Sequence, residues 1–130
     1  MSNFTEPLVV EYLNNNKWKI CREFNYYTSI PYNNVVVDET KDPYWITIKE
    51  GFVTDFASVP RIFWNVMSPY DKHAKAAVIH DYLYKTRELP RKICDKIFLE
   101  AMEVLGVSWW KRNLMYYIVR VLGKKHYGSI

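Results

Sequence analysis

The sequence predicts an α+β domain in which an antiparallel, β-rich part, residues 1–60, packs against a three-helix part, residues 61–130. Two observations lead to this prediction. Short β-branched and aromatic runs separated by turn residues fill the first part, whereas long segments with helical periodicity fill the second. The pattern changes near Pro60. With 130 residues, the chain is long enough to form one domain with its own core.

Five strands are predicted in the first part. A turn at Asn14–Asn16 joins the first two strands, and the stretch Ile30–Asn34 forms a loop before the third. The expected strands are Leu8–Tyr12, Trp18–Arg22, Val35–Val37, Tyr44–Ile48 and Gly51–Thr54.

Three helices are predicted in the second part. Pro90 suits the first position of the second helix, and Gly106 ends that helix. Ser108 is the expected N-cap of the third helix, and Gly123 ends it. The short link between the first two helices favours an antiparallel pair. The expected helices run from an N-cap at Asp71 to about Lys85, from Pro90 to Leu105 and from Trp109 to Leu122.

Ionisable residues interrupt the apolar faces of the first two helices. At about 100° per residue, Asp95 falls among apolar side chains, away from the charged face of its helix. His80 and Tyr84 share one face of the preceding helix, and Asp81 lies at the edge of its buried surface. We expect His80 to bond Asp95, with Asp81 and Tyr84 nearby. Because burial of such groups is costly unless they are paired, this is either a structural polar network or a working site.

A loop between the two parts carries three further polar candidates. Asp55, Ser58 and Arg61 lie among apolar neighbours at a junction of strand and helix, where loops often present active-site groups. The alternative is local, since Asp55 and Ser58 can cap the short turn at residues 61–64.

Composition limits the function classes. A net charge of +4 is only mildly basic, which is compatible with an anionic ligand but makes duplex DNA an unfavoured partner. Cys21 and Cys94 lack metal-ligand spacing and are expected to be core thiols in a reducing compartment. No secretory signal and no membrane-spanning segment is evident in the sequence.

The third helix is expected to contribute mainly to the core. Its apolar residues are Trp109, Trp110, Leu114, Met115, Tyr117, Ile118, Val121 and Leu122. The functional alternative is a basic aromatic edge that stacks bases and neutralises phosphates, as for a nucleotide ligand. That edge would comprise Lys111, Arg112, Arg120, Lys124, Lys125 and His126, with Trp110 and Tyr127. Basic helix C-termini are also usual on macrodipole grounds alone.

Three segments resemble an uncharacterised protein family encoded mainly by bacteriophages and prophages. The resemblance extends from about Gly51 to Gly128, and it implies a viral origin but no particular activity. Because no secretory signal is evident, we expect the protein to stay in the host cytoplasm. The segments that carry the resemblance are Gly-Phe-Val-Thr-Asp-Phe-Ala-Ser-Val-Pro at 51–60, Ala-Ala-Val-Ile-His-Asp-Tyr-Leu-Tyr at 76–84 and Cys-Asp-Lys-Ile-Phe-Leu-Glu-Ala-Met at 94–102.

A looser resemblance is to the secreted and bacterial phospholipases A2. Their core pairs a His-Asp-x-x-Tyr helix with a helix that carries an Asp, which matches residues 80–84 and Asp95. The resemblance implies that His80 activates a water, Asp95 orients its ring, Tyr84 braces Asp95 and Asp81 binds calcium. The chain departs from those enzymes in lacking their Gly- and Cys-rich calcium loop and their disulfides, and in its β-rich first part.

Several functions therefore remain open at the level of sequence. The first is a hydrolase of ester or amide bonds, membrane lipid among them, with Asp81 and Asp55 holding a cation and Ser58 and Arg61 contacting substrate. The second is a non-catalytic binder of a ligand such as a nucleotide signal of host defence, and the third is a virion or assembly component. A Ser58–His80–Asp95 triad is a weaker alternative, because Ser58 lacks the context of a nucleophile elbow. A zinc site is also weaker, since the chain has only three histidines and no zinc-ligand spacing.

Overall fold

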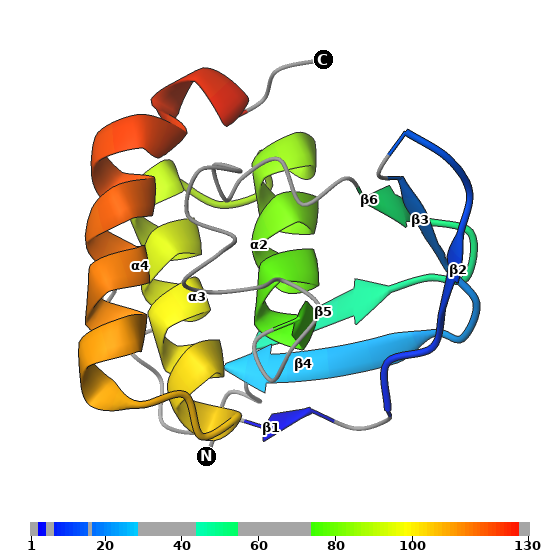
Figure 1. Ribbon diagram of the computed structural model, residues 1–130, viewed down its shortest axis with the longest axis horizontal. Helices are drawn as coiled ribbons and strands as arrows, with labels where there is room; N and C mark the ends of the chain where they lie inside the picture. The colour runs from blue at the N-terminus through cyan, green and yellow to red at the C-terminus, as the bar shows by residue number, and fades with distance from the viewer. Residues whose placement is uncertain (1–2, 5–6, 16, 29–43, 55–73, 128–130) are drawn as a thin grey trace.

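The computed structural model describes residues 3–4, 7–15, 17–28, 44–54 and 74–127 (Figure 1). Among these residues, antiparallel strands form the first part of the chain and three α-helices the second, which confirms the predicted α+β class. In Figure 1 the helices stand side by side, and the strands lie to the right of and below the helix that comes first in the chain.

The larger sheet has the strand order β1-β4-β5, with every pair antiparallel. Its strands are β1 (Asn3–Phe4), β4 (Phe24–Thr28) and β5 (Tyr44–Ile48). Along β4 the side chains of Phe24, Tyr26 and Thr28 are buried, and the two between them are half-buried, as the two-residue period of a strand requires. The predicted strand at β5 is confirmed, whereas β4 was missed by the sequence analysis.

The second sheet has the order β2-β3-β6 and is also antiparallel. Its strands are β2 (Val10–Tyr12), β3 (Trp18–Ile20) and β6 (Val53–Thr54). The predicted turn between the first two is confirmed, and Asn15 adopts a φ of 49° there, a conformation that Asn tolerates better than most residues. All three strands are shorter than predicted, and the predicted strand Val35–Val37 lies outside the described residues.

The three predicted helices are present as α2 (Ala74–Thr86), α3 (Arg91–Val104) and α4 (Trp109–Leu122). A short 3₁₀ helix, η2 (Gly123–His126), follows α4. Ser108 is the N-cap of α4 as predicted, whereas Pro90 is the N-cap of α3 rather than its first residue. The predicted start at Asp71 lies outside the described residues. Within the described ranges, no helix is long and apolar enough to cross a membrane.

Helix α2 occupies the middle of the molecule. It contacts α3 on one side and strands β5 and β6 on the other, and nine of its thirteen residues are buried. A helix enclosed in this way must bury its polar side chains together with its apolar ones. The position of α2 therefore places His80 and Asp81 inside the protein, where each needs a partner.

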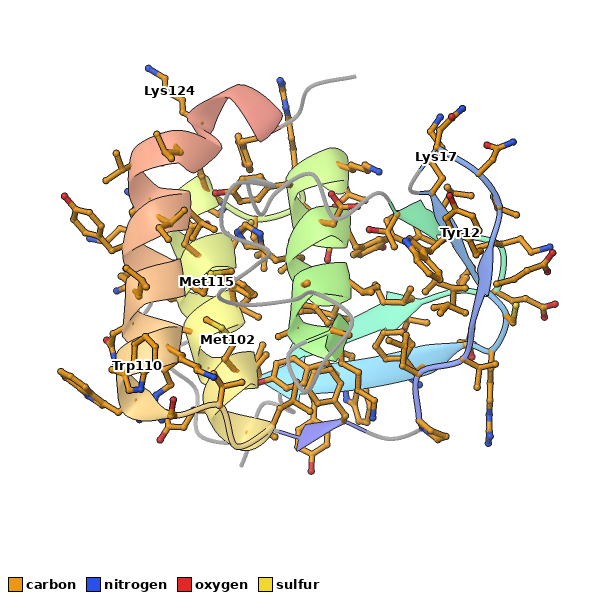
Figure 2. All side chains as sticks on the ribbon, viewed as in Figure 1. Tyr12, Lys17, Met102, Trp110, Met115 and Lys124 are labelled. Atoms are coloured by element: carbon orange, nitrogen blue, oxygen red, sulfur yellow. The ribbon has the colours of Figure 1, made fainter. Side chains whose placement is uncertain are left out.

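Helix α4 lies at the outer edge of the helical layer, where it packs on α3 (Figure 1). Its buried residues are Met115, Ile118 and Val119, and Figure 2 shows Met115 on the side toward α3. The prediction that its apolar residues belong mostly to the core is wrong, because no described element covers the outer half of this helix. Six of them are exposed: Trp109, Trp110, Leu114, Tyr117, Val121 and Leu122.

Candidate functional site: a buried His–Asp centre

The α2–α3 pair places His80 opposite Asp95. The two helices are antiparallel neighbours joined by a four-residue link, which begins at Arg87 with a φ of 54° (Figure 1). Nε2 of His80 lies 2.7 Å from Oδ1 of Asp95, and both side chains are fully buried. The predicted pairing is confirmed, and the nitrogen involved is Nε2.

Asp95 accepts hydrogen bonds from three side chains. His80 donates to Oδ1 through Nε2, and the Tyr84 hydroxyl donates to the same oxygen at 2.5 Å. Nη1 of Arg120 donates to Oδ2 at 2.7 Å. The donors come from α2 and α4, so this one carboxylate joins all three helices. We call these four residues, His80, Tyr84, Asp95 and Arg120, the Asp95 centre.

Arg120 is the member that sequence analysis missed. It was assigned to the exposed face of its helix, whereas its side chain is only 33% exposed and its guanidinium is directed at Asp95. The available signal was electrostatic. A carboxylate on an apolar face requires a counter-charge, and an arginine on the next helix is suited to supply one because its guanidinium keeps its charge when partly buried.

The partners of Asp95 keep it ionised. Burial alone would raise the pKa of this carboxyl group, but the hydrogen bond and charge of His80 and the hydrogen bonds from Tyr84 and Arg120 lower it below its ordinary value. Burial, and to a smaller extent the hydrogen bond to Asp95, raises the pKa of Tyr84 well above its usual range. The Tyr84 hydroxyl therefore stays protonated and able to donate. The centre thus holds an ionised carboxylate, paired with the Arg120 guanidinium, in a fixed geometry.

The His80 ring is held between two aromatic side chains. It stacks on Phe98 with ring centroids 4.6 Å apart and contacts Tyr84 at 4.1 Å. Because an ionised carboxylate can only accept, Nε2 carries the proton that is shared with Asp95, and in the neutral ring Nδ1 then has a free lone pair. Nδ1 is buried and has no hydrogen-bond partner among the residues that the structure describes.

Contacts from the end of the chain support Tyr84. Tyr127 packs edge-on against the Tyr84 ring at 5.4 Å and donates a 2.7 Å hydrogen bond to the carbonyl of Leu89 in the α2–α3 link. At Gly123 the backbone passes so close that a Cβ there would lie 2.8 Å from Oη of Tyr84. The chain after α4 therefore packs directly on the residue that braces Asp95.

The second predicted acid, Asp81, is directed toward the sheet. Its Oδ2 accepts a 2.6 Å hydrogen bond from the Thr54 hydroxyl of β6 and lies 3.2 Å from Nζ of Lys85. Asp81 is 3% exposed, whereas the Lys85 side chain reaches the surface. We call Thr54, Asp81 and Lys85 the Asp81 cluster.

The other predicted site residues are only partly accounted for. Asp55, Ser58 and Arg61 lie outside the described residues, so the cation-binding and substrate-binding roles expected of them stay predictions. Within the ranges that the structure describes, no three His, Cys, Asp or Glu side chains are grouped so as to hold a metal ion.

The predicted basic aromatic edge is divided in the structure. Arg120 and Tyr127 turn inward to the Asp95 centre and its support, whereas Trp110 and Lys124 are exposed.

Both cysteines are free: Cys94 is buried, and burial raises the pKa of its thiol to about 12, whereas Cys21 is only half-buried.

Comparison with known proteins gives one match. The model of a family described as "Protein of unknown function (DUF1353)" matches residues 18–119, which include α2, α3 and most of α4. No curated protein matches the chain, and no solved structure matches it.

Proposed function

The chain belongs to the DUF1353 family, whose description assigns no activity, and we propose from the Asp95 centre that it is a hydrolase with His80 as general base. The observation that carries the proposal is that the two nitrogens of the His80 ring have different surroundings. Nε2 is tied to a buried carboxylate, and Nδ1 has a lone pair with no partner among the described residues. A carboxylate that fixes one nitrogen of an imidazole orients the other for proton transfer.

Each member of the centre has a role in the proposed reaction. His80 removes a proton from water through Nδ1 as the water oxygen attacks the carbonyl carbon of an ester. The imidazolium that forms is stabilised by the Asp95 charge, and it returns the proton to the leaving oxygen as the carbon–oxygen bond breaks. Tyr84 and Arg120 hold the carboxylate in place.

The proposed substrate is a carboxylic ester, with membrane lipid as the first candidate on the phospholipase-like pattern of α2 and α3. A calcium ion at Asp81, which that pattern also implies, would have to compete with the Lys85 ammonium 3.2 Å from Oδ2. A viral origin, which rests on the sequence resemblance alone, belongs to the same proposal, and so does a place in the host cytoplasm.

Burial supports a competing interpretation, in which the same residues only specify the fold. The His80 side chain is fully buried, so a substrate can reach Nδ1 only if the residues covering the ring move aside. A structural network needs no such opening. Activity and stability must therefore be measured on the same variants.

The decisive variant is His80→Gln, because glutamine can still donate a hydrogen bond toward Asp95 but cannot act as a base. Wild type and variant are assayed on a nitrophenyl ester and on phosphatidylglycerol vesicles, with Tyr84→Phe as the matched control that removes one donor to Asp95 and leaves the base. We expect hydrolysis to fall by about 10²–10⁴-fold in His80→Gln, the usual contribution of a general base, and much less in Tyr84→Phe.

Circular dichroism and thermal unfolding check that the variants are folded. Equal hydrolysis by folded His80→Gln and wild type, or no hydrolysis of either substrate by wild type, would favour the structural network.

The calcium role is tested separately by the melting temperature with calcium and with chelator. A rise with calcium that Asp81→Asn abolishes supports a cation there, and no shift at millimolar calcium contradicts it.

A further inference from the structure

The outward face of α4 carries an unbroken row of apolar side chains. Trp110, Leu114, Tyr117 and Val121 are 54%, 38%, 66% and 56% exposed, respectively. Steps of four, three and four residues place them along one line of the helix. We call these four residues the α4 stripe.

Such a stripe is unusual on the outside of a protein. A surface helix normally packs its apolar face inward and presents charged residues to water. Helix α4 does pack inward, through Met115, Ile118 and Val119, yet the middle of its opposite face is also apolar. Contiguous exposed apolar patches of this kind commonly mark an interaction surface.

The charge at this end of the chain indicates what covers the stripe. Residues 105–130 contain five of the eighteen Lys and Arg and none of the fourteen Asp and Glu. By sequence this end carries +5 and the rest of the chain sums to −1, and four cations remain here once Arg120, which is paired with Asp95, is set aside. The partner of the stripe is thus expected to be anionic.

The positions of the lysines fit the same conclusion. Lys111 Nζ lies 5.6 Å from the centre of the Trp110 ring, and the exposed Lys124 follows the end of α4. Figure 2 shows Trp110 beside the first turn of α4 and Lys124 at its opposite end. The apolar row therefore has a cation near each end.

Three kinds of occupant can be compared on these facts. A second copy would bring two segments together that each carry four cations besides Arg120 and no acid, which like-charge repulsion opposes. Single-stranded nucleic acid can stack on Trp110 and Tyr117, but it makes little use of the aliphatic Leu114 and Val121. An anionic membrane surface uses all of them, since Trp and Tyr favour the interface, aliphatic side chains enter the acyl boundary and lysines attract the headgroups.

We propose that the α4 stripe and its flanking lysines dock the protein on the surface of an anionic lipid bilayer. Helix α4 has fourteen residues, about 21 Å at the usual rise of an α-helix, so it lies along the surface instead of crossing it. The proposal rests on α4 alone and not on the hydrolase. If both hold, the stripe brings His80 to a surface of ester-linked lipid.

The test is co-sedimentation of the full chain with vesicles. Vesicles of equal parts phosphatidylglycerol and phosphatidylcholine are compared with phosphatidylcholine alone, at low and at high salt. We expect binding to the anionic vesicles that weakens as salt rises. Trp110→Ser and Tyr117→Ser should each weaken it by roughly tenfold, because each removes a large side chain from the apolar contact.

Trp45→Ser is the matched control. Trp45 is 52% exposed on β5, in the sheet and not on α4, so its loss should leave vesicle binding unchanged. His80→Gln is included to separate the two proposals, because it should bind vesicles as wild type does even if the proposed hydrolase is wrong.

Three results would overturn the proposal. The first is no binding to anionic vesicles at low salt, and the second is equal binding to both kinds of vesicle. The third is a different occupant, shown by a dimer that Trp110→Ser dissociates or by tight binding of a single-stranded oligonucleotide without vesicle binding.

Discussion

Two buried carboxylates, Asp95 on α3 and Asp81 on α2, are stabilised in different ways. Asp95 has no exposed surface and accepts hydrogen bonds from His80, Tyr84 and Arg120. Asp81 is nearly as buried, but the ammonium of Lys85 that pairs with it belongs to a side chain that is 39% exposed. Only the Asp95 centre combines full burial of the acid with a fully buried imidazole.

The difference shows that burial by itself does not identify a site. The Asp81 cluster attaches α2 to β6 and keeps a countercharge in contact with water, as expected of a structural anchor. The Asp95 centre joins three helices, and it leaves one ring nitrogen without a partner among the described residues. A fold-specifying network has no need of that free nitrogen, whereas a general base requires it.

The largest expected effect is on stability and comes from removing the Asp95 carboxylate. Asp95→Ala should lower the free energy of unfolding by about 3–5 kcal/mol, because it leaves a buried imidazole and a partly buried guanidinium unpaired. Asp81→Ala should cost less, about 1–3 kcal/mol, because it removes the hydrogen bond from Thr54 and an ion pair whose Lys85 side chain is partly exposed. Urea denaturation monitored by tryptophan fluorescence measures both.

Glu103→Ala is the matched control for this comparison. Glu103 is an exposed acid on the same helix as Asp95, and its loss should change stability by less than about 0.5 kcal/mol. Equal losses for the Asp95 and Asp81 variants would remove the distinction between the two carboxylates.

A smaller effect is expected from pH. Burial would raise the pKa of Asp95, but His80, Tyr84 and Arg120 lower it, so its folded-state pKa lies below the unfolded value of about 3.9. The stability that this depression contributes is therefore fully present above about pH 4 and is lost as the pH falls through the folded-state pKa.

The stability difference between wild type and Asp95→Asn isolates this contribution from that of the other acids. It should be largest near neutral pH and shrink below about pH 4. Urea midpoints across this range measure it. A difference that stays constant down to the lowest accessible pH would mean that the Asp95 charge contributes nothing.

Helical periodicity was sufficient to predict most of the Asp95 centre. It fixes which face each residue occupies, and a short link fixes the neighbouring helix, so His80, Tyr84 and Asp95 could be brought together from sequence. Arg120 could not, because its direction depends on how α4 packs against α3. How α4 packs against α3 also determines which face of α4 is covered. Because the sequence alone does not give this packing, Trp110 and the other residues of the α4 stripe were wrongly assigned to the core.

The strand β4 was missed for a related reason. Its sequence, Phe-Asn-Tyr-Tyr-Thr, contains an Asn that disfavours strands, and its stability comes from five paired positions on β5, twenty residues away in the chain. One of those pairs adds a 2.6 Å hydrogen bond between Thr47 and the Asn25 side chain. Four of its five residues favour strands, so local preference was compatible with β4, but it could not show that β5 lies beside it.

The most direct test of the central claim is the position of the proton on His80. Nitrogen-15 NMR of the labelled protein, recorded at a pH where the His80 ring is neutral, distinguishes the two ring nitrogens, and His80→Gln identifies the signals. We predict a proton on Nε2, directed at Asp95, and an unprotonated Nδ1. A proton on Nδ1 would contradict the account, because the ring would then have no lone pair with which to activate water.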